Sequence, residues 1–95
     1  MIEMMRFQLA PGVSTEEFLK VDKALQAEFA YQQPGLLRRT TAHDHDGNWI
    51  VIDLWRSESD SDACSRRWDD DELAQRFADL MDKSSTRIER YQALD

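Results

Sequence analysis

Residues 42–55, AHDHDGNWIVIDLW, contain both histidines of the chain, three aspartates and two of its three tryptophans. Such residues could form a metal site, a catalytic cluster or a tight turn between two strands. Asp46-Gly47 between two β-rich runs favours the turn, because a two-residue hairpin loop needs positive φ at both positions. We therefore predict a β-hairpin with Asp46-Gly47 as its loop.

This loop sets the pairing of the two predicted strands. The expected cross-strand pairs are Asp44 with Trp49, His43 with Ile50, Ala42 with Val51, Thr40 with Asp53, and Arg38 with Trp55. In this register Thr40 lies beside Asp53, and Arg38 lies diagonal to it.

A metal site at the histidines is the main alternative. His43 and His45 are two residues apart, so both rings would face one side of a strand. Two imidazoles do not fill a tetrahedral site, and Asp44 points to the other face. A calcium loop fails because Gly47 in its sixth place would put Ala42 first, where a carboxylate is needed. We therefore expect no metal and two exposed histidines beside a turn.

Asp53 interrupts an otherwise apolar run in the middle of a strand, so its carboxylate must be either paired or perturbed. It is either a satisfied polar group at a dimer seam or a pocket carboxylate. Trp55 and Trp68 could both be core residues. Trp68, which lies next to the expected helix break, could instead form the wall of a cavity. Cys64 lies near Asp60 and Asp62, which should raise its pKa, so we do not expect a nucleophile there.

Hydrophobic periodicity predicts the elements that position these residues. Helix one starts at Ser14, which has capping-box spacing to Glu17, and ends at residues 32–35. The expected strands are 2–9, 36–43, 48–56 and 85–94, with a second helical region at about 60–82 broken near 69–71. The order β-α-β-β-α-β predicts a single α+β domain, residues 1–95, with a ferredoxin-like fold: a four-stranded antiparallel sheet with helices on one face.

The strand at 48–56 is apolar on both faces, so both faces need a cover. Trp49, Val51 and Trp55 lie on one face and Ile50, Ile52 and Leu54 on the other. Helices would cover one of these faces, and this small chain cannot cover the other by itself. The simplest cover is the same face of a second copy, so we predict a homodimer.

The formal net charge is −7 and no run of Lys or Arg builds a basic stripe, which argues against nucleic acid and anionic membranes as partners. The single cysteine excludes an intrachain disulfide and favours a reducing compartment. Residues 1–12 begin acidic and alternating, unlike a signal peptide, and no apolar run approaches the roughly 20 residues that span a bilayer. We expect a cytoplasmic location.

Residues 32–63, QQPGLLRRTTAHDHDGNWIVIDLWRSESDSDA, resemble the central hairpin of the antibiotic biosynthesis monooxygenase-like proteins of the dimeric α+β barrel superfamily. The matching features are Gln33-Pro34-Gly35-Leu36 before the strand, Asp46-Gly47 at the turn, and Trp55-Arg56-Ser57 before a helix containing Ala63. The resemblance in element order covers nearly the whole chain.

This resemblance implies a homodimer with a cleft in each subunit between sheet and helices. Some members of the family oxidise polycyclic aromatic phenols or anthrones with O₂ and without flavin, metal or haem. The resemblance therefore implies a cofactor-independent monooxygenase with no cofactor and a small apolar or aromatic substrate. The protein would bind the rings, stabilise an oxyanion and exclude water.

The candidate site residues follow from these considerations. The predicted catalytic residues are Trp68, Asp53 and His43, and the predicted substrate-binding residues are Arg38, Trp55, Phe18 and Phe77. The alternative is a non-catalytic dimeric module that binds a small ligand or docks on a larger enzyme. An open space between sheet and helices beside Trp68 would favour the enzyme, whereas a space filled by Trp68, Phe18 and Phe77 would favour the module.

Haem degradation is a further activity within this superfamily. The haem-degrading relatives depend on an asparagine in strand one and a histidine on the last helix. This chain has Arg6 and Gln8 in strand one, and residues 70–82 contain no histidine. Only Trp68 resembles their tryptophan, so we do not expect this activity.

Overall fold

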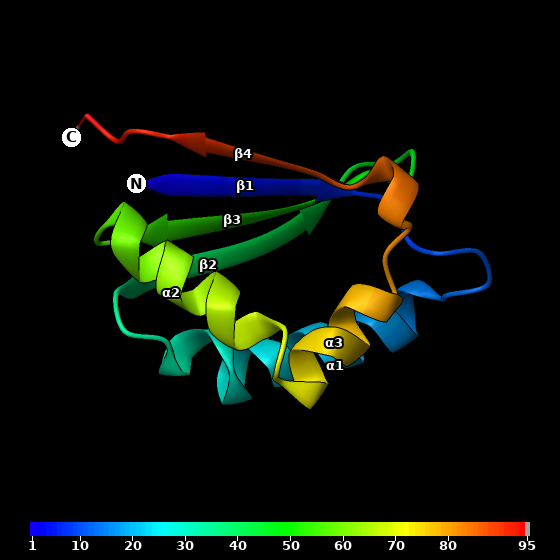
Figure 1. The fold of residues 1–95 in the computed structure, drawn as a ribbon. Coiled ribbons are helices and arrows are strands. Elements are labelled where there is room, and N and C mark those ends of the chain that lie inside the picture. The colour runs from blue at the N-terminus through cyan, green and yellow to red at the C-terminus, as the bar shows by residue number, and fades with distance from the viewer. Residues whose placement is uncertain (95) are drawn as a thin grey trace.

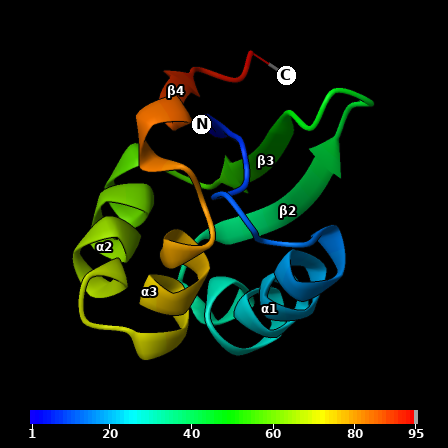
Figure 2. The ribbon, with the colours of Figure 1, turned by 90° about the vertical axis from the view of Figure 1, so that its right-hand side faces the viewer.

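The computed structural model describes residues 1–94, which form a four-stranded antiparallel sheet covered on one face by helices (Figures 1 and 2). The strands are β1 (Ile2–Phe7), β2 (Leu36–His43), β3 (Trp49–Trp55) and β4 (Arg87–Tyr91), in the order β2-β3-β1-β4. The helices are α1 (Thr15–Glu28), α2 (Glu58–Trp68) and α3 (Glu72–Asp79), with short 3-10 helices η1 (Ala30–Gln32) and η2 (Lys83–Ser85). The predicted ferredoxin-like α+β fold is confirmed.

Helix α1 begins where the sequence predicts. The Ser14 side chain accepts a hydrogen bond of 3.1 Å from the backbone N–H of Glu17, which satisfies a donor that the helix itself leaves unpaired. Phe18, Val21 and Leu25 follow at helical spacing and are buried against the sheet.

The second helical region is divided in two, as the acidic run at 69–71 predicts. Helix α2 begins at Glu58, two residues before the expected start, and Ser57 caps it by accepting a hydrogen bond of 3.2 Å from Asp60 N–H. Asp71 caps α3 by accepting a bond of 2.8 Å from Ala74 N–H. Trp68 is therefore the last residue of α2, and its side chain packs at the junction of the two helices.

The β2–β3 loop differs from the prediction. The Asp44 carboxylate accepts hydrogen bonds from the backbone N–H groups of Asp46 at 2.8 Å and Asn48 at 3.0 Å. Asp44 N–H in turn donates to Asn48 O at 3.0 Å, so the loop is the three residues His45-Asp46-Gly47. Gly47, with φ of 83°, supplies the left-handed position that such a loop needs.

The longer loop moves the strand register by one residue, so the predicted cross-strand pairs are wrong. Asp53 lies opposite Arg39 rather than Thr40, and Arg38 lies opposite Leu54 rather than Trp55. Because side chains alternate between the faces of a sheet, a shift of one residue exchanges the faces of the β2 residues relative to β3. Arg39 therefore lies on the helical side with Asp53, while Arg38 lies on the open side.

The core is centred on four aromatic rings between the sheet, α1 and α3. The Phe18 ring lies 5.6, 4.8 and 5.2 Å from the rings of Phe7, Trp49 and Phe77, measured between centroids. These rings are tilted against one another, the geometry in which aromatic pairs add to burial energy. The four rings of this cluster come from β1, β3, α1 and α3, and none comes from α2.

The open face of the sheet carries apolar side chains, as predicted for the third strand. Ile50, Ile52 and Leu54 of β3 lie on it, and Met4 and Ile2 of β1 stand opposite Ile52 and Leu54. All five side chains are half-buried in the single chain.

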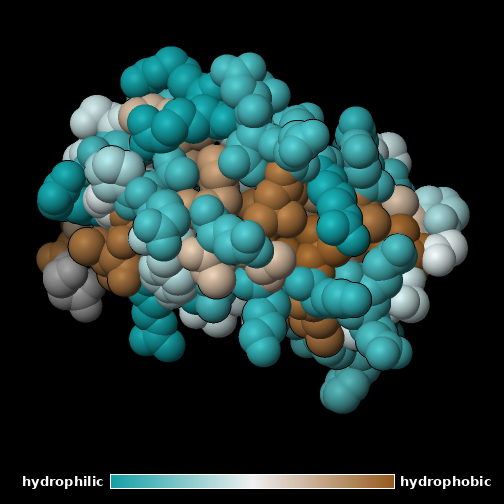
Figure 3. Space-filling view, turned by 90° about the horizontal axis from the view of Figure 1, so that it is seen from below, coloured by the Kyte–Doolittle hydropathy of each residue, from teal (hydrophilic) through white to brown (hydrophobic). Residues whose placement is uncertain are grey.

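The helical side has a different surface. Hydrophilic residues predominate there around a central band of hydrophobic ones (Figure 3). Within residues 1–94 no helix has the length and hydropathy needed to cross a membrane.

Gly35 sets how closely α2 approaches the start of β2, and this makes it sensitive to substitution. It has φ of +86°, and a Cβ there would collide with the Asp60 side chain. Gly35→Ala is expected to lower the free energy of unfolding by about 2 kcal/mol or more, through backbone strain plus the collision. Gly12→Ala is the control, because Gly12 has φ of +83° but open space around it, and should cost about 1 kcal/mol. Urea unfolding measures both, and equal losses would show that the contact with Asp60 is unimportant.

Candidate functional site

A cavity of about 380 Å³ lies between the sheet and α2, beside Trp68. This volume is within the range of small-molecule sites. Of the two alternatives for this space, the structure has the open one, and Phe18 and Phe77 do not fill it. Its lining is mostly apolar, with several polar groups, and comprises Glu3, Met5, Asp53, Trp55, Ser61, Cys64, Ser65, Trp68, Asp69, Met81, Thr86 and Ile88.

Trp68 forms one wall and is held by other aromatic rings. It meets the rings of Phe29 at 5.6 Å and Phe77 at 5.9 Å, both edge to face. These contacts fix the indole while leaving it half-buried at the cavity. A flat apolar wall of this kind suits the face of an aromatic ligand.

Asp53 supplies a carboxylate to this apolar space. Its Oδ1 is buried, and no group of residues 1–94 donates a hydrogen bond to it. The nearest cation is Arg39, whose Nε lies 3.9 Å away. Burial raises the pKa of Asp53 to about 6; Arg39 opposes the rise, and the carboxylates of Glu3 and Asp22 add to it. Asp53 is therefore a carboxylate suited to accept a proton near neutral pH.

Arg39 is held away from Asp53 by a second carboxylate on α1. Its Nη2 donates to Asp22 Oδ1 at 2.7 Å, and its guanidinium carbon lies 5.6 Å above the Phe77 ring. Thr41 Oγ1 also donates to Asp22 Oδ1, at 3.1 Å. The Arg39 and Asp22 side chains are only 3% and 10% exposed, so this is a buried pair whose disruption would be costly.

Trp55 is a second residue of the cavity lining with a buried polar atom that is unpaired in the described chain. It lies two residues after Asp53 on the same face of β3, and its side chain lines the cavity. Its indole Nε1 is buried, and within residues 1–94 it has no acceptor. Since an unpaired buried donor is destabilising, the indole N–H would gain from a ligand oxygen.

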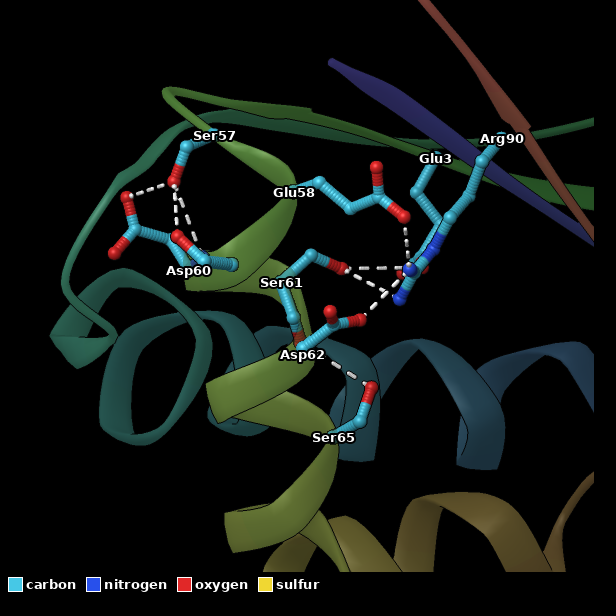
Figure 4. Close-up of polar contacts among 9 residues, drawn as sticks. Glu3, Ser57, Glu58, Asp60, Ser61, Asp62, Ser65 and Arg90 are labelled. Atoms are coloured by element: carbon cyan, nitrogen blue, oxygen red, sulfur yellow. Dashed lines mark hydrogen bonds and ion pairs between the residues drawn. The ribbon is translucent and has the colours of Figure 1, made fainter.

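A charged cluster joins β4, β1 and α2 (Figure 4), and two of its members, Glu3 and Ser61, line the cavity. Arg90 of β4 donates to Glu3 at 2.9 Å, to Asp62 at 2.8 Å and to Ser61 Oγ at 3.1 Å. Its Nη1 also lies 3.5 Å from Glu58. Ser61 Oγ donates to Glu3 at 3.2 Å, so the Glu3 carboxylate is fixed at the cavity by two elements.

Cys64 also borders the cavity but is a poor nucleophile. Burial raises the pKa of its thiol to about 11, and the charge of Asp53 adds to the rise. The expected direction is confirmed, although the causes are burial and Asp53 rather than Asp60 and Asp62.

The structure separates the predicted site residues into two groups. Trp68, Asp53 and Trp55 come together at the cavity. Phe18 and Phe77 are fully buried core residues and do not line it. Their interior position follows from the strict apolar stripe that each helix turns to the sheet.

Arg38 and His43 also lie outside the cavity lining. Arg38 is exposed on the open side of the sheet, because of the one-residue change in register. The His43 ring stacks at 4.5 Å from Trp49, and its Nδ1 lies 2.8 Å from the backbone oxygen of Asp44, at the end of the hairpin. In residues 1–94 no group of three or more His, Cys, Asp or Glu side chains is arranged to hold a metal ion.

Arg39, Asp22 and Glu3 were not predicted as site residues. One signal for Asp22 was present, since it stands at an apolar-stripe position of α1, directly after Val21 and three residues before Leu25. A carboxylate at such a position needs a buried partner. Arg39 could be assigned as that partner only with the correct hairpin register.

Solved structures share this architecture over nearly the whole chain. A variant of SnoaB, a cofactor-independent oxygenase from Streptomyces nogalater, aligns with a TM-score of 0.78 at 20% identity, covering 99% of this chain and 92% of that one. The At3g17210 protein of Arabidopsis thaliana aligns with a TM-score of 0.79 at 15% identity, covering 99% and 95%. A structure described as an antibiotic biosynthesis monooxygenase aligns with a TM-score of 0.65 at 16% identity, covering 100% of both chains.

The chain has the fold of the antibiotic biosynthesis monooxygenases. The resemblance predicted from residues 32–63 is thus confirmed at the level of the fold. No protein-family model and no curated protein sequence matches the chain.

The raised pKa of Asp53 predicts a specific pH dependence of stability. With a pKa of about 6 when folded and about 3.9 when unfolded, the native state binds more protons between these values, so stability falls as pH rises from 4 to 7. The substitution Asp53→Asn removes the titrating group, so the variant should not lose stability in this way as the pH rises. The free energy of unfolding of the variant, minus that of the unmodified protein, should grow by roughly 2 kcal/mol from pH 4 to 7.

Urea titrations at several pH values measure this difference directly. Asp79→Asn is the matched control, because the Asp79 side chain is 74% exposed and lies outside the cavity lining. Its difference from the unmodified protein should stay nearly constant with pH. A constant difference for Asp53→Asn as well would contradict the raised pKa.

Proposed function

We propose that the chain is a cofactor-independent monooxygenase that acts on an apolar aromatic substrate in the cavity beside Trp68. The observation that carries this proposal is a buried carboxylate, Asp53, in an apolar cavity of about 380 Å³, with a pKa of about 6. The structural likeness to a cofactor-independent oxygenase supports the same reaction class.

The reaction would begin with proton transfer. A substrate with an acidic C–H next to a carbonyl or phenol ring gives a proton to Asp53 and becomes a carbanion whose charge is delocalised onto oxygen. The Trp55 indole N–H, which has no acceptor among residues 1–94, is the donor available to that oxygen. Trp68 would hold the ring system flat against the cavity wall.

The electrons then come from the substrate itself. The carbanion reduces O₂, one oxygen atom becomes a carbonyl at the deprotonated carbon, and the other leaves as water with the two hydrogens of the original CH₂ group. No flavin, haem or metal is needed for this stoichiometry. The protein contributes the base, the oxyanion donor and exclusion of bulk water.

Oxygen uptake with an anthrone tests this proposal. Asp53→Asn and Trp68→Ala should each lower kcat/KM at least tenfold, because they remove the base and the ring-binding wall. In the unmodified protein kcat/KM should rise with pH through about 6, as Asp53 becomes ionised. Asp79→Asn, remote from the cavity, should leave the rate unchanged.

Two results of these experiments would contradict the proposal. If the anthrone stabilises the protein against heat without oxygen uptake above the uncatalysed rate, the chain is a binding module and not an oxygenase. If uptake persists in Asp53→Asn with an unchanged pH profile, another group is the base.

We also propose that the protein acts as a homodimer through its open sheet face, in a reducing cytoplasm. Five half-buried apolar side chains of β1 and β3 lie on this face: Ile2, Met4, Ile50, Ile52 and Leu54. Burying such a face against its copy is the simplest way to remove it from water.

A charge at the centre of this face should separate the subunits. Ile52→Lys should convert a dimer to a monomer at micromolar concentration, as measured by light scattering after size exclusion, because an unpaired ammonium group would be buried in the interface. Leu19→Lys is the control, since Leu19 is exposed on α1, away from this face. A monomeric unmodified protein, or a dimer that survives Ile52→Lys, would contradict the proposed interface.

A further inference from the structure

Two guanidinium groups beside the cavity, those of Arg39 and Arg90, are already matched by carboxylates. Arg39 lies 2.7 Å from Asp22 and 3.9 Å from Asp53. Arg90 lies 2.9 Å from Glu3, 2.8 Å from Asp62 and 3.5 Å from Glu58. Figure 4 shows the carboxylates converging on Arg90 from β1 and α2. Neither cation is therefore free to bind an anionic ligand.

The charged residues that line the cavity are all acidic. The lining includes three acidic residues, Glu3, Asp53 and Asp69, and no Lys, Arg or His of the described chain. The guanidinium groups of Arg39 and Arg90 together face five carboxylates. Because the largely buried carboxylates of Glu3 and Asp53 lie among apolar groups such as Met5 and Trp55, water screens their two charges poorly.

We propose that this cavity selects its ligand by charge: it takes an uncharged ring system and rejects one that carries a carboxylate, with Asp53 and Glu3 as the selectivity residues. This inference rests on the proposed function in so far as the cavity is the substrate site. A ligand carboxylate would lose its water and meet two carboxylates without gaining a free cation, so its burial is disfavoured.

Charge selection fits the proton transfer proposed above. When a neutral substrate passes its proton to Asp53, the negative charge moves from the aspartate to the substrate, and the total charge of the cavity does not change. A substrate that already carried a carboxylate would add a second negative charge beside Glu3. The substrate class is therefore an uncharged aromatic ketone or phenol.

Three probes of nearly equal shape test this inference by isothermal titration calorimetry at pH 7.5. They are 2-naphthylmethanol, which is neutral, 2-naphthoate, which is anionic, and 2-naphthylmethylamine, which is cationic. The naphthoate should bind at least tenfold more weakly than the alcohol, a difference of about 1.4 kcal/mol. The amine should bind at least as tightly as the alcohol, because the same charges attract it.

Variants identify the residues responsible. Asp53→Asn, Glu3→Gln and the double variant keep the shape of the cavity while removing charge, so naphthoate should approach the affinity of the alcohol in the double variant. Asp79→Asn removes an equal charge outside the cavity and should retain the full discrimination. Thermal melts verify that each variant is folded.

Two results would overturn the inference. Naphthoate binding within threefold of the alcohol in the unmodified protein, or discrimination that survives in the folded double variant, would show that these carboxylates do not select the ligand. In either case the oxygen-uptake assay would still stand as a separate test. Failure of all three probes to bind would contradict both the charge selection and the use of the cavity as the substrate site.

Discussion

The Asp44 carboxylate determines the alignment of β2 on β3, and the candidate site depends on that alignment. By accepting hydrogen bonds from Asp46 and Asn48, it stabilises a three-residue loop in place of a two-residue one. The resulting register places Arg39 opposite Asp53 on the helical side of the sheet. A shift of one residue would move this arginine to the open side and leave Asp22 and Asp53 without their cation.

The elements could be predicted from the sequence because the apolar spacing is regular and the caps are standard. Ser14 and Asp71 both act as helix caps, and the acidic run at 69–71 ends one helix before the next begins. The hairpin register could not be predicted from the hydrophobic pattern, since Asp46-Gly47 is compatible with loops of two or three residues. The choice depends on hydrogen bonds that the Asp44 side chain accepts, and hydrophobic periodicity carries no information about them.

The candidate site could be predicted only in part, for the same reason. Trp68, Asp53 and Trp55 stand out by residue type, and the structure brings them together at the cavity. The charges that surround Asp53 come from α1, β1 and β2, so they could be assigned only after the strands and helices were placed. Asp53 lacks a hydrogen bond at Oδ1 among residues 1–94, an arrangement that costs stability and is typical of groups kept for chemistry rather than for folding.

Two thioether side chains, Met5 and Met81, border the cavity together with Ile88. Methionine is unbranched and polarisable, so it can follow ring systems of different outline without movement of the backbone. The aromatic wall at Trp68, by contrast, is braced by Phe29 and Phe77. A cavity lined by a fixed ring and by adaptable thioethers would accept a family of related ring skeletons, and replacing a methionine would change which skeletons fit while Asp53 and the fold stay as they are.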